Sequence, residues 1–149
     1  MYTFVLAIHN IVRWVVLLLG LWAAYRAWSG WLGKRPWTSA DRKAGVFFGS
    51  AFDTQLLLGL ILYFFLSPIT RAAFSNFGAA MADPSMRFFA IEHMFYMLLG
   101  VIFVHLGSIL AKKAPTDGGK HQRAAILFSL AMLVILIGMP WMRSLLPVF

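Results

Sequence analysis

Four long apolar stretches divide the chain, and short polar segments separate them. Each stretch approaches or exceeds the roughly 20 residues that a helix needs to cross the hydrocarbon core of a bilayer. Because lipid offers no partners for backbone N–H and C=O groups, each stretch is predicted to be a helix. The predicted transmembrane helices are Phe4 to Tyr25, Ala44 to Leu66, Phe88 to Leu110 and Ala124 to Leu146. The pattern therefore predicts an all-α integral membrane protein, with four transmembrane helices in an antiparallel up-down bundle.

The composition supports this assignment. Of the 149 residues, 61% are hydrophobic and 12% are charged, whereas soluble domains are about half apolar and about one quarter charged. No internal repeat is visible, so residues 1–149 are predicted to form a single four-helix transmembrane domain. The chain has no cysteine, which excludes disulfides, iron–sulfur clusters and thiolate metal sites. No basic segment precedes the first apolar stretch, which is therefore expected to be a retained helix and not a signal peptide.

The positive charges gather in two of the connecting loops. They are Arg26, Lys34, Arg35, Arg42 and Lys43 in the first loop, and Lys112, Lys113, Lys120 and Arg123 in the third. By alternation these loops share one side, and the opposite side carries little beyond Arg71, Arg87 and Arg143. The positive-inside rule places the basic side in the cytoplasm, so both termini are expected outside. A net charge of +8 beside apolar spans indicates contact with membrane lipids, and not nucleic acid.

The loop after the second stretch, residues 67–86, is longer and less charged than the basic loops. Its centre is rich in alanine and phenylalanine, which favours a short helix lying on the membrane surface. An ordinary loop that caps the bundle is an equally good interpretation. The sequence leaves both open.

Two histidines are expected at one depth in the outer half of the bundle. Ionisable side chains within a membrane usually face the bundle interior and mark functional sites. His9 and His93 each lie five residues into a helix that enters from the outside, roughly 8 Å below the outer boundary. Arg13 follows His9 by four residues and shares its face. Glu92 adjoins His93 about 100° around the helix, and an Arg13–Glu92 ion pair is geometrically possible.

A second polar set is expected in the inner half. Asp53 and His105 differ in predicted depth by about 6 Å, so they either bond one another or satisfy neighbouring backbone groups. His121 falls in a basic loop and is given no role. The fourth helix has no charge before Arg143 and is expected to be a packing wall that Pro140 bends or ends.

Two level imidazoles on facing helices suit a haem iron. Gly100 would leave room for the porphyrin, and Arg13 or Arg87 would pair with its propionates. The structural alternatives are hydrogen-bonded histidines and, at Gly100, close helix approach. Zinc is disfavoured, because it needs three or four converging ligands, and His9, His93 and Glu92 would converge only if the helices rotated to suit.

Three segments resemble a family of small four-helix bacterial membrane proteins labelled cytochrome b-like. They are "LAIHNIVRWVVLLLG", "DRKAGVFFGSAFDTQLLLGLILYF" and "MRFFAIEHMFYMLLGVIFVHLGS". The resemblance implies a haem-binding or electron-transfer role in the bacterial inner (cytoplasmic) membrane, with His9 and His93 at the family's H-x-x-x-R-W and E-H positions. An electron carrier or complex subunit is then expected, rather than a stand-alone enzyme.

The leading hypothesis is a membrane b-type cytochrome-like protein that holds one haem b between the first and third helices. His9 and His93 would ligate the haem iron, Arg13 and Arg87 would neutralise the propionates, and Glu92 would orient the site. Electrons would pass within a respiratory or photosynthetic chain, to or from quinone or the other subunits of a membrane redox complex. The alternative is a cofactor-free accessory subunit of a larger membrane electron-transfer complex. A small transporter or channel ranks third, since no inverted repeat is present.

Overall fold

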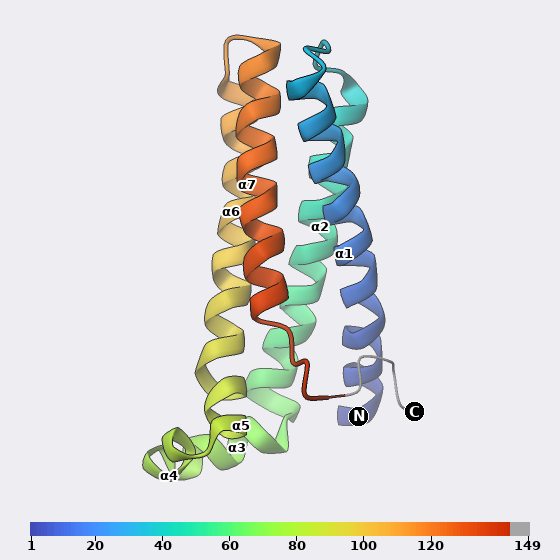
Figure 1. Ribbon diagram of the computed structural model, residues 1–149. Helices are drawn as coiled ribbons and strands as arrows, with labels where there is room; N and C mark the ends of the chain where they lie inside the picture. Colours follow the sequence, from blue (N-terminus) through green and yellow to red (C-terminus); the bar gives the residue numbers. More distant parts are fainter. Residues whose placement is uncertain (144–149) are drawn as a thin grey trace.

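The computed structural model describes residues 1–143 and shows a bundle of four long helices with three short helices at one end (Figure 1). No β-strand occurs among these residues. The long helices are α1 (Tyr2–Leu32), α2 (Ser39–Ile61), α6 (His93–Lys113) and α7 (Asp117–Ile137). A π-helical turn, η1 (Leu62–Leu66), extends α2, and a second one, η2 (Phe88–Glu92), leads into α6. The short helices are α3 (Pro68–Ser75), α4 (Phe77–Ala82) and α5 (Pro84–Arg87).

Four helical segments are long and apolar enough to cross a membrane, which confirms the predicted all-α class. They are Tyr2–Leu32, Ser39–Leu66, Pro84–Lys113 and Asp117–Ile137. Successive long helices run in opposite directions (Figure 1). α1 packs on α2 and α7, and α6 packs on the same two helices, so α1 and α6 face each other diagonally. Many large apolar side chains point outward, such as Leu18, Phe47, Leu57 and Phe95, as expected of a surface that lipid covers.

Aromatic side chains fill the core where glycines leave space. Phe48, Phe52 and Phe128 are almost completely buried, and the Phe48 ring lies 6.2 Å from Phe52 and 5.8 Å from Phe128 by centroids. A Cβ atom on Gly100 would approach Phe52 to 2.8 Å. The space at Gly100 is therefore used for close packing between helices, and not for a cofactor.

The fourth helix differs from its prediction at both ends. It begins at Asp117 and not at Ala124, because the Thr116 hydroxyl caps it by accepting a 3.1 Å hydrogen bond from the Gly119 N–H. It ends at Ile137 and not at Leu146, in keeping with the proline at position 140, which cannot continue a helix. The predicted residues 144–146 lie outside the described residues. Because α7 ends early, space remains between the other three long helices for the site described below.

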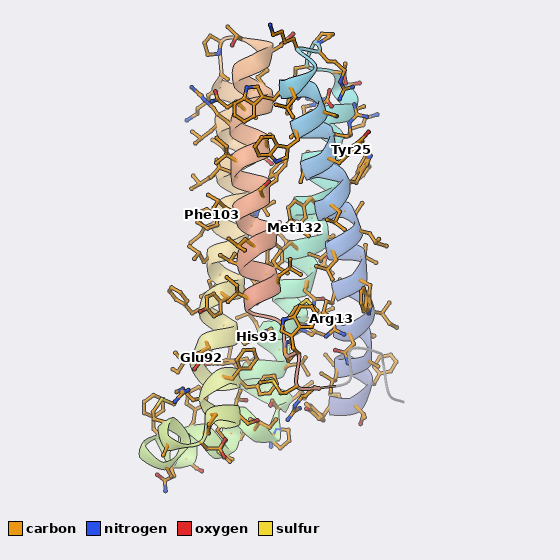
Figure 2. All side chains as sticks on the ribbon, in the orientation of Figure 1. Arg13, Tyr25, Glu92, His93, Phe103 and Met132 are labelled. Atoms are coloured by element: carbon orange, nitrogen blue, oxygen red, sulfur yellow. The ribbon has the colours of Figure 1, made fainter. Side chains whose placement is uncertain are left out.

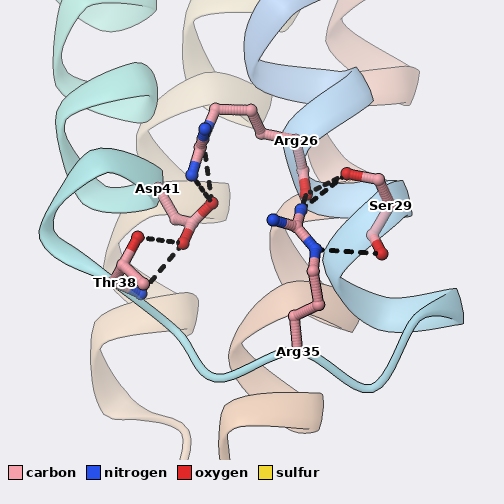
Figure 3. Close-up of polar contacts among 5 residues, drawn as sticks. All are labelled: Arg26, Ser29, Arg35, Thr38 and Asp41. Atoms are coloured by element: carbon pink, nitrogen blue, oxygen red, sulfur yellow. Dashed lines mark hydrogen bonds and ion pairs between the residues drawn. The ribbon is translucent and has the colours of Figure 1, made fainter.

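A polar network joins α1 to α2 at the end that carries the basic loops (Figure 3). The Asp41 carboxylate accepts from the Arg26 guanidinium at 2.8 Å and from the Thr38 backbone N–H at 2.9 Å. The Arg35 guanidinium donates to the Ser29 hydroxyl at 2.7 Å. Arg26 and Arg35 therefore stabilise the connection between α1 and α2. This connection is shorter than the sequence suggests, because α1 continues to Leu32.

The segment between α2 and α6 is helical throughout most of its length, with three short helices where one of the two interpretations expected a single one. Ser67, Asn76 and Asp83 each precede a short helix, and the side chain of each accepts a hydrogen bond from the backbone N–H three residues later. Such caps start helices and break the chain direction. α3, α4 and α5 lie at the end of the bundle opposite the basic loops, beside the ends of α2 and α6 and away from α1 (Figure 1).

Candidate histidine site

Two histidines meet across the bundle, one from each of the diagonal helices. His9 lies in α1 and His93 begins α6. Their ring centroids are 6.5 Å apart, with the ring planes inclined at 69°. Both rings lie near the end of the bundle where α1 begins, and Figure 2 shows His93 near Arg13 at this level. The structure therefore brings together the two side chains that were expected at one depth.

A cavity of about 360 Å³ adjoins both histidines. It lies where α7 has ended but the other three long helices continue, so residues of the chain after α7 close one side. Its lining combines apolar side chains with a smaller polar set. The apolar residues include Phe52, Phe89, Met94, Met97, Ile135 and Met139. The polar residues include Asn10, Arg13, Gln55, Tyr63, Thr70 and Arg143.

The end of α7 orients His93. The Nδ1 atom of His93 lies 2.7 Å from the carbonyl oxygen of Gly138, the residue that follows the last turn of the helix. The final carbonyl groups of a helix have no partner within it, and here an imidazole N–H supplies one. Because Nδ1 carries the donated hydrogen, the lone pair of a neutral His93 lies on Nε2.

Gln55 holds His9 from the neighbouring helix. The Nε2 atoms of Gln55 and His9 are 3.2 Å apart. The His9 Nδ1 atom and the Gln55 Oε1 atom are both buried without a hydrogen-bond partner among the described residues. Gly59 permits this arrangement, since a Cβ atom there would lie 3.3 Å from the Cε1 atom of His9. Unsatisfied buried polar atoms are costly, so they mark a place where a ligand or water is expected.

Two arginines line the cavity beside the histidines. Arg13 is 6% exposed and lies one turn along α1 from His9. The Arg143 guanidinium carbon lies 4.5 Å from the centroid of the Phe89 ring. The site therefore combines two imidazole rings with positive charge, in a lining that is mainly apolar.

The structure separates Arg87 and Glu92 from this cavity. Their side chains bond each other at 2.8 Å on the surface, and neither residue lines the cavity. The possible Arg13–Glu92 pair does not form, because Glu92 bonds Arg87 instead. In an α-helix residues five apart point about 140° away from each other. The π-helical turn η2, which includes Glu92, brings that spacing onto one face.

The second polar set forms a direct contact. The His105 Nε2 atom lies 2.8 Å from the Asp53 Oδ1 atom, which confirms the first of the two expected arrangements. Both side chains are about half exposed on the outer surface of α2 and α6. They do not belong to the cavity.

The sequence reasoning missed two residues. Gln55 was not considered, although an amide within a predicted span is a signal of an interior polar contact. His121 was assigned to a loop, but it is fully buried in α7, its ring 4.8 Å from Trp37 by centroids. A Cβ atom on Gly30 would fall 2.1 Å from the His121 ring. The helix-capping sequence at Thr116 was the signal that could have placed His121 within a helix.

No group of three or more His, Cys, Asp or Glu side chains able to hold a metal ion occurs among residues 1–143. Within this part of the chain, His9 and His93 are a pair of side chains of a type that can bind a metal. A metal bound here has to bring most of its other ligands with it. Comparisons of the chain with family models, with curated proteins and with solved structures gave no match.

Proposed function

We propose that this chain is a membrane b-type cytochrome-like electron carrier that binds haem between His9 and His93. The observation that carries the proposal is the 6.5 Å separation of the two imidazole centroids. A metal–imidazole bond is about 2 Å long, so an iron held by two imidazoles separates their centroids by about 6 Å. The side chains already have the spacing that such ligation needs.

The hydrogen bond of His93 leaves its Nε2 for a metal, since Nδ1 donates to the Gly138 carbonyl. On His9 the Gln55 amide nitrogen lies against Nε2, so in a neutral ring Nε2 accepts and Nδ1 carries the hydrogen. Nδ1 would become the metal-binding nitrogen if the Gln55 amide turned to present Oε1, which has no partner among the described residues, as the acceptor for an Nε2–H. A hydrogen bond to the ring nitrogen that does not bind the metal fixes the tautomer and the direction of a metal-ligating histidine.

The lining of the cavity, apolar side chains with two arginines, has the chemistry that an apolar cofactor with acidic groups would need. The cavity volume of about 360 Å³ lies at the lower end of the usual range for small-molecule sites, roughly 300–1,000 Å³, so a porphyrin would extend into the opening of the cavity. Bound haem would supply reversible one-electron transfer at its iron. Phe52, Met94 and Met97 would exclude water, and Arg13 and Arg143 would neutralise carboxylates. Arg87 and Glu92 have no part in this assignment, because they pair with each other outside the cavity.

The charges support one orientation for the carrier. Both basic connections lie at the end of the bundle remote from His9 and His93 (Figure 1). The positive-inside rule puts that end in the cytoplasm, so the histidine site lies near the outer surface of the membrane, which the family resemblance assigns as bacterial. Electrons would pass between the quinone pool or a partner subunit and an acceptor outside.

Haem analysis of the purified protein tests the proposal. The full chain is expressed with ample haem, extracted in mild detergent and reduced. We expect a b-type α-band and a pyridine haemochrome at about one haem per chain. His9→Ala and His93→Ala should each abolish the low-spin spectrum, whereas His105→Ala, a matched control on α6, should leave it intact. Absence of haem from the wild-type protein, or a normal spectrum in both variants, contradicts the proposal.

The accessory-subunit hypothesis makes different predictions for the same preparation. A cofactor-free subunit would be extracted with stoichiometric partner subunits and without haem. Its polar residues would then serve only to set helix packing. Haem in the free chain excludes this alternative.

A further inference from the structure

A polar pair lies on the lipid-facing surface of the bundle, outside the lining of the histidine cavity. The Asp53 and His105 side chains are 50% and 48% exposed. The exposed neighbours of His105 on α6 are apolar, and Asp53 lies on α2 among the exposed residues Ser50, Thr54 and Leu57. Asp53 lies 14 residues after the start of a 28-residue membrane span, and thus about halfway along it. At this depth no water is available to cover a polar group, and ionisable residues there normally face protein.

The pair has unused hydrogen-bonding capacity. The contact joins His105 Nε2 to Asp53 Oδ1, and among the described residues neither His105 Nδ1 nor Asp53 Oδ2 has a partner. The form with no net charge is the least costly in lipid. In that form the pair has one further hydrogen to donate, from His105 Nδ1 or from the Asp53 carboxyl, and one further acceptor.

We propose that this face is the interface of a homodimer, in which Asp53 of each copy hydrogen-bonds His105 of the other. The Asp53 face consists of Ser50, Asp53 and Leu57 of α2 and Ile102, His105 and Ile109 of α6. Two copies inserted with the same topology can be related by a two-fold axis along the membrane normal. Such an axis keeps every residue at its own depth. Asp53 and His105 are bonded within one chain, so they share a depth. Asp53 of one copy can therefore reach His105 of the second copy, and His105 of the first can reach Asp53 of the second.

Self-complementarity is the reason for choosing a second copy over another occupant. Each chain presents one donor and one acceptor at the same level, so two chains satisfy all four groups without leaving a net charge. A different partner would have to bring a matching pair at the same depth. Ser50, one turn from Asp53, is small enough for close helix approach. Neither Asp53 nor His105 lines the cavity, so the dimer does not depend on the haem proposal.

Cysteine cross-linking in membranes tests the interface, and the natural chain has no cysteine to interfere. Ser50→Cys and Leu57→Cys are oxidised separately in liposomes at low protein density. Leu18→Cys on α1 and Leu133→Cys on α7, both exposed, are the matched controls. We expect a disulfide-linked dimer from the first two variants and none from the controls. Equal cross-linking at all four positions, or none at the Asp53 face, overturns the proposal.

A second measurement separates a polar contact from simple apolar association. Asp53→Leu combined with His105→Leu removes both hydrogen bonds between copies while keeping the face compatible with lipid. The dimer should weaken roughly tenfold, as expected for the loss of two interhelical hydrogen bonds in a membrane. Helix content by circular dichroism checks that the double variant still folds. Unchanged dimerisation of the double variant refutes the interface. A different protein or a lipid-soluble molecule bound at this face, in place of a second copy, refutes it as well.

Discussion

The Nδ1 atom of His93 lies 2.7 Å from the carbonyl oxygen of Gly138, so the end of one membrane helix orients a histidine at the start of another. A helix that continued past this point would use that carbonyl for its own hydrogen bond. The histidine is therefore directed by the termination of α7. The same termination leaves the cavity beside it.

Gly138→Ala should disturb this contact. A Cβ atom there would lie 2.6 Å from the Cβ atom of Tyr96, which forces a backbone shift costing about 1–3 kcal/mol. We expect a lower thermal stability together with a weakened low-spin haem spectrum. Gly78→Ala is the control, because no atom lies within 4 Å of its added Cβ. Unchanged stability in Gly138→Ala would mean that the carbonyl position is not constrained.

Gln55→Leu tests the role of the amide that contacts His9. Loss of a hydrogen bond to the ring nitrogen that does not bind the metal typically lowers metal affinity about 10- to 100-fold. Haem should therefore dissociate faster from this variant. Competition for haem by an apo-globin measures the change. Thr54→Val alters an exposed neighbouring residue and should bind haem as the wild type does. Equal affinities in the two variants would argue against a positioning role for Gln55.

Arg13→Gln and Arg87→Gln distinguish the two arginines that the sequence proposed for the propionates. A nearby positive charge favours the reduced haem, because reduction removes one positive charge from the iron. Arg13→Gln should therefore lower the midpoint potential, by roughly 40 mV for about 1 kcal/mol of lost interaction. Arg87→Gln should leave it unchanged, since Arg87 pairs with Glu92 on the surface. Potentiometric titration of both proteins decides the assignment, and a larger shift from Arg87→Gln would reverse it.

Gly30→Ala should destabilise the basic end of the bundle without altering the haem site. The new Cβ would overlap the His121 ring, so overpacking costs about 1–3 kcal/mol. Thermal unfolding measures the loss. Replacing His121 by Ala in the same chain removes the overlap, and the double variant should lose less stability than the two separate losses predict together. Strict additivity would show that the two residues do not interact.

The features that follow from helix geometry were predictable from the sequence. Apolar length located the four membrane segments, and the rise per residue placed His9 level with His93. The same arithmetic allowed the Asp53–His105 contact that the structure confirms. These predictions held because a helix in lipid has little freedom to depart from its regular geometry.

The features that depend on irregular backbone were not predictable in the same way. The π-helical turn η2 changes the angular relation between Arg87 and Glu92, so their pairing has no counterpart in an ideal α-helix. The boundaries of α7 depend on the Thr116 cap and on the residues around Pro140. A local cap can start a helix within a segment that composition assigns to a loop, and His121 was missed for this reason.

The position of Gly138 in the chain also has a consequence for the order of assembly. His9, Gln55 and His93 belong to the first three long helices, which are synthesised and can be inserted before α7 exists. The group that orients His93, and the residues that close one side of the cavity, follow α7 in the chain. The site is thus completed only after α7 and the residues that follow it have been synthesised, so the three-helix stage presents the two histidines in a more open setting to the proposed haem.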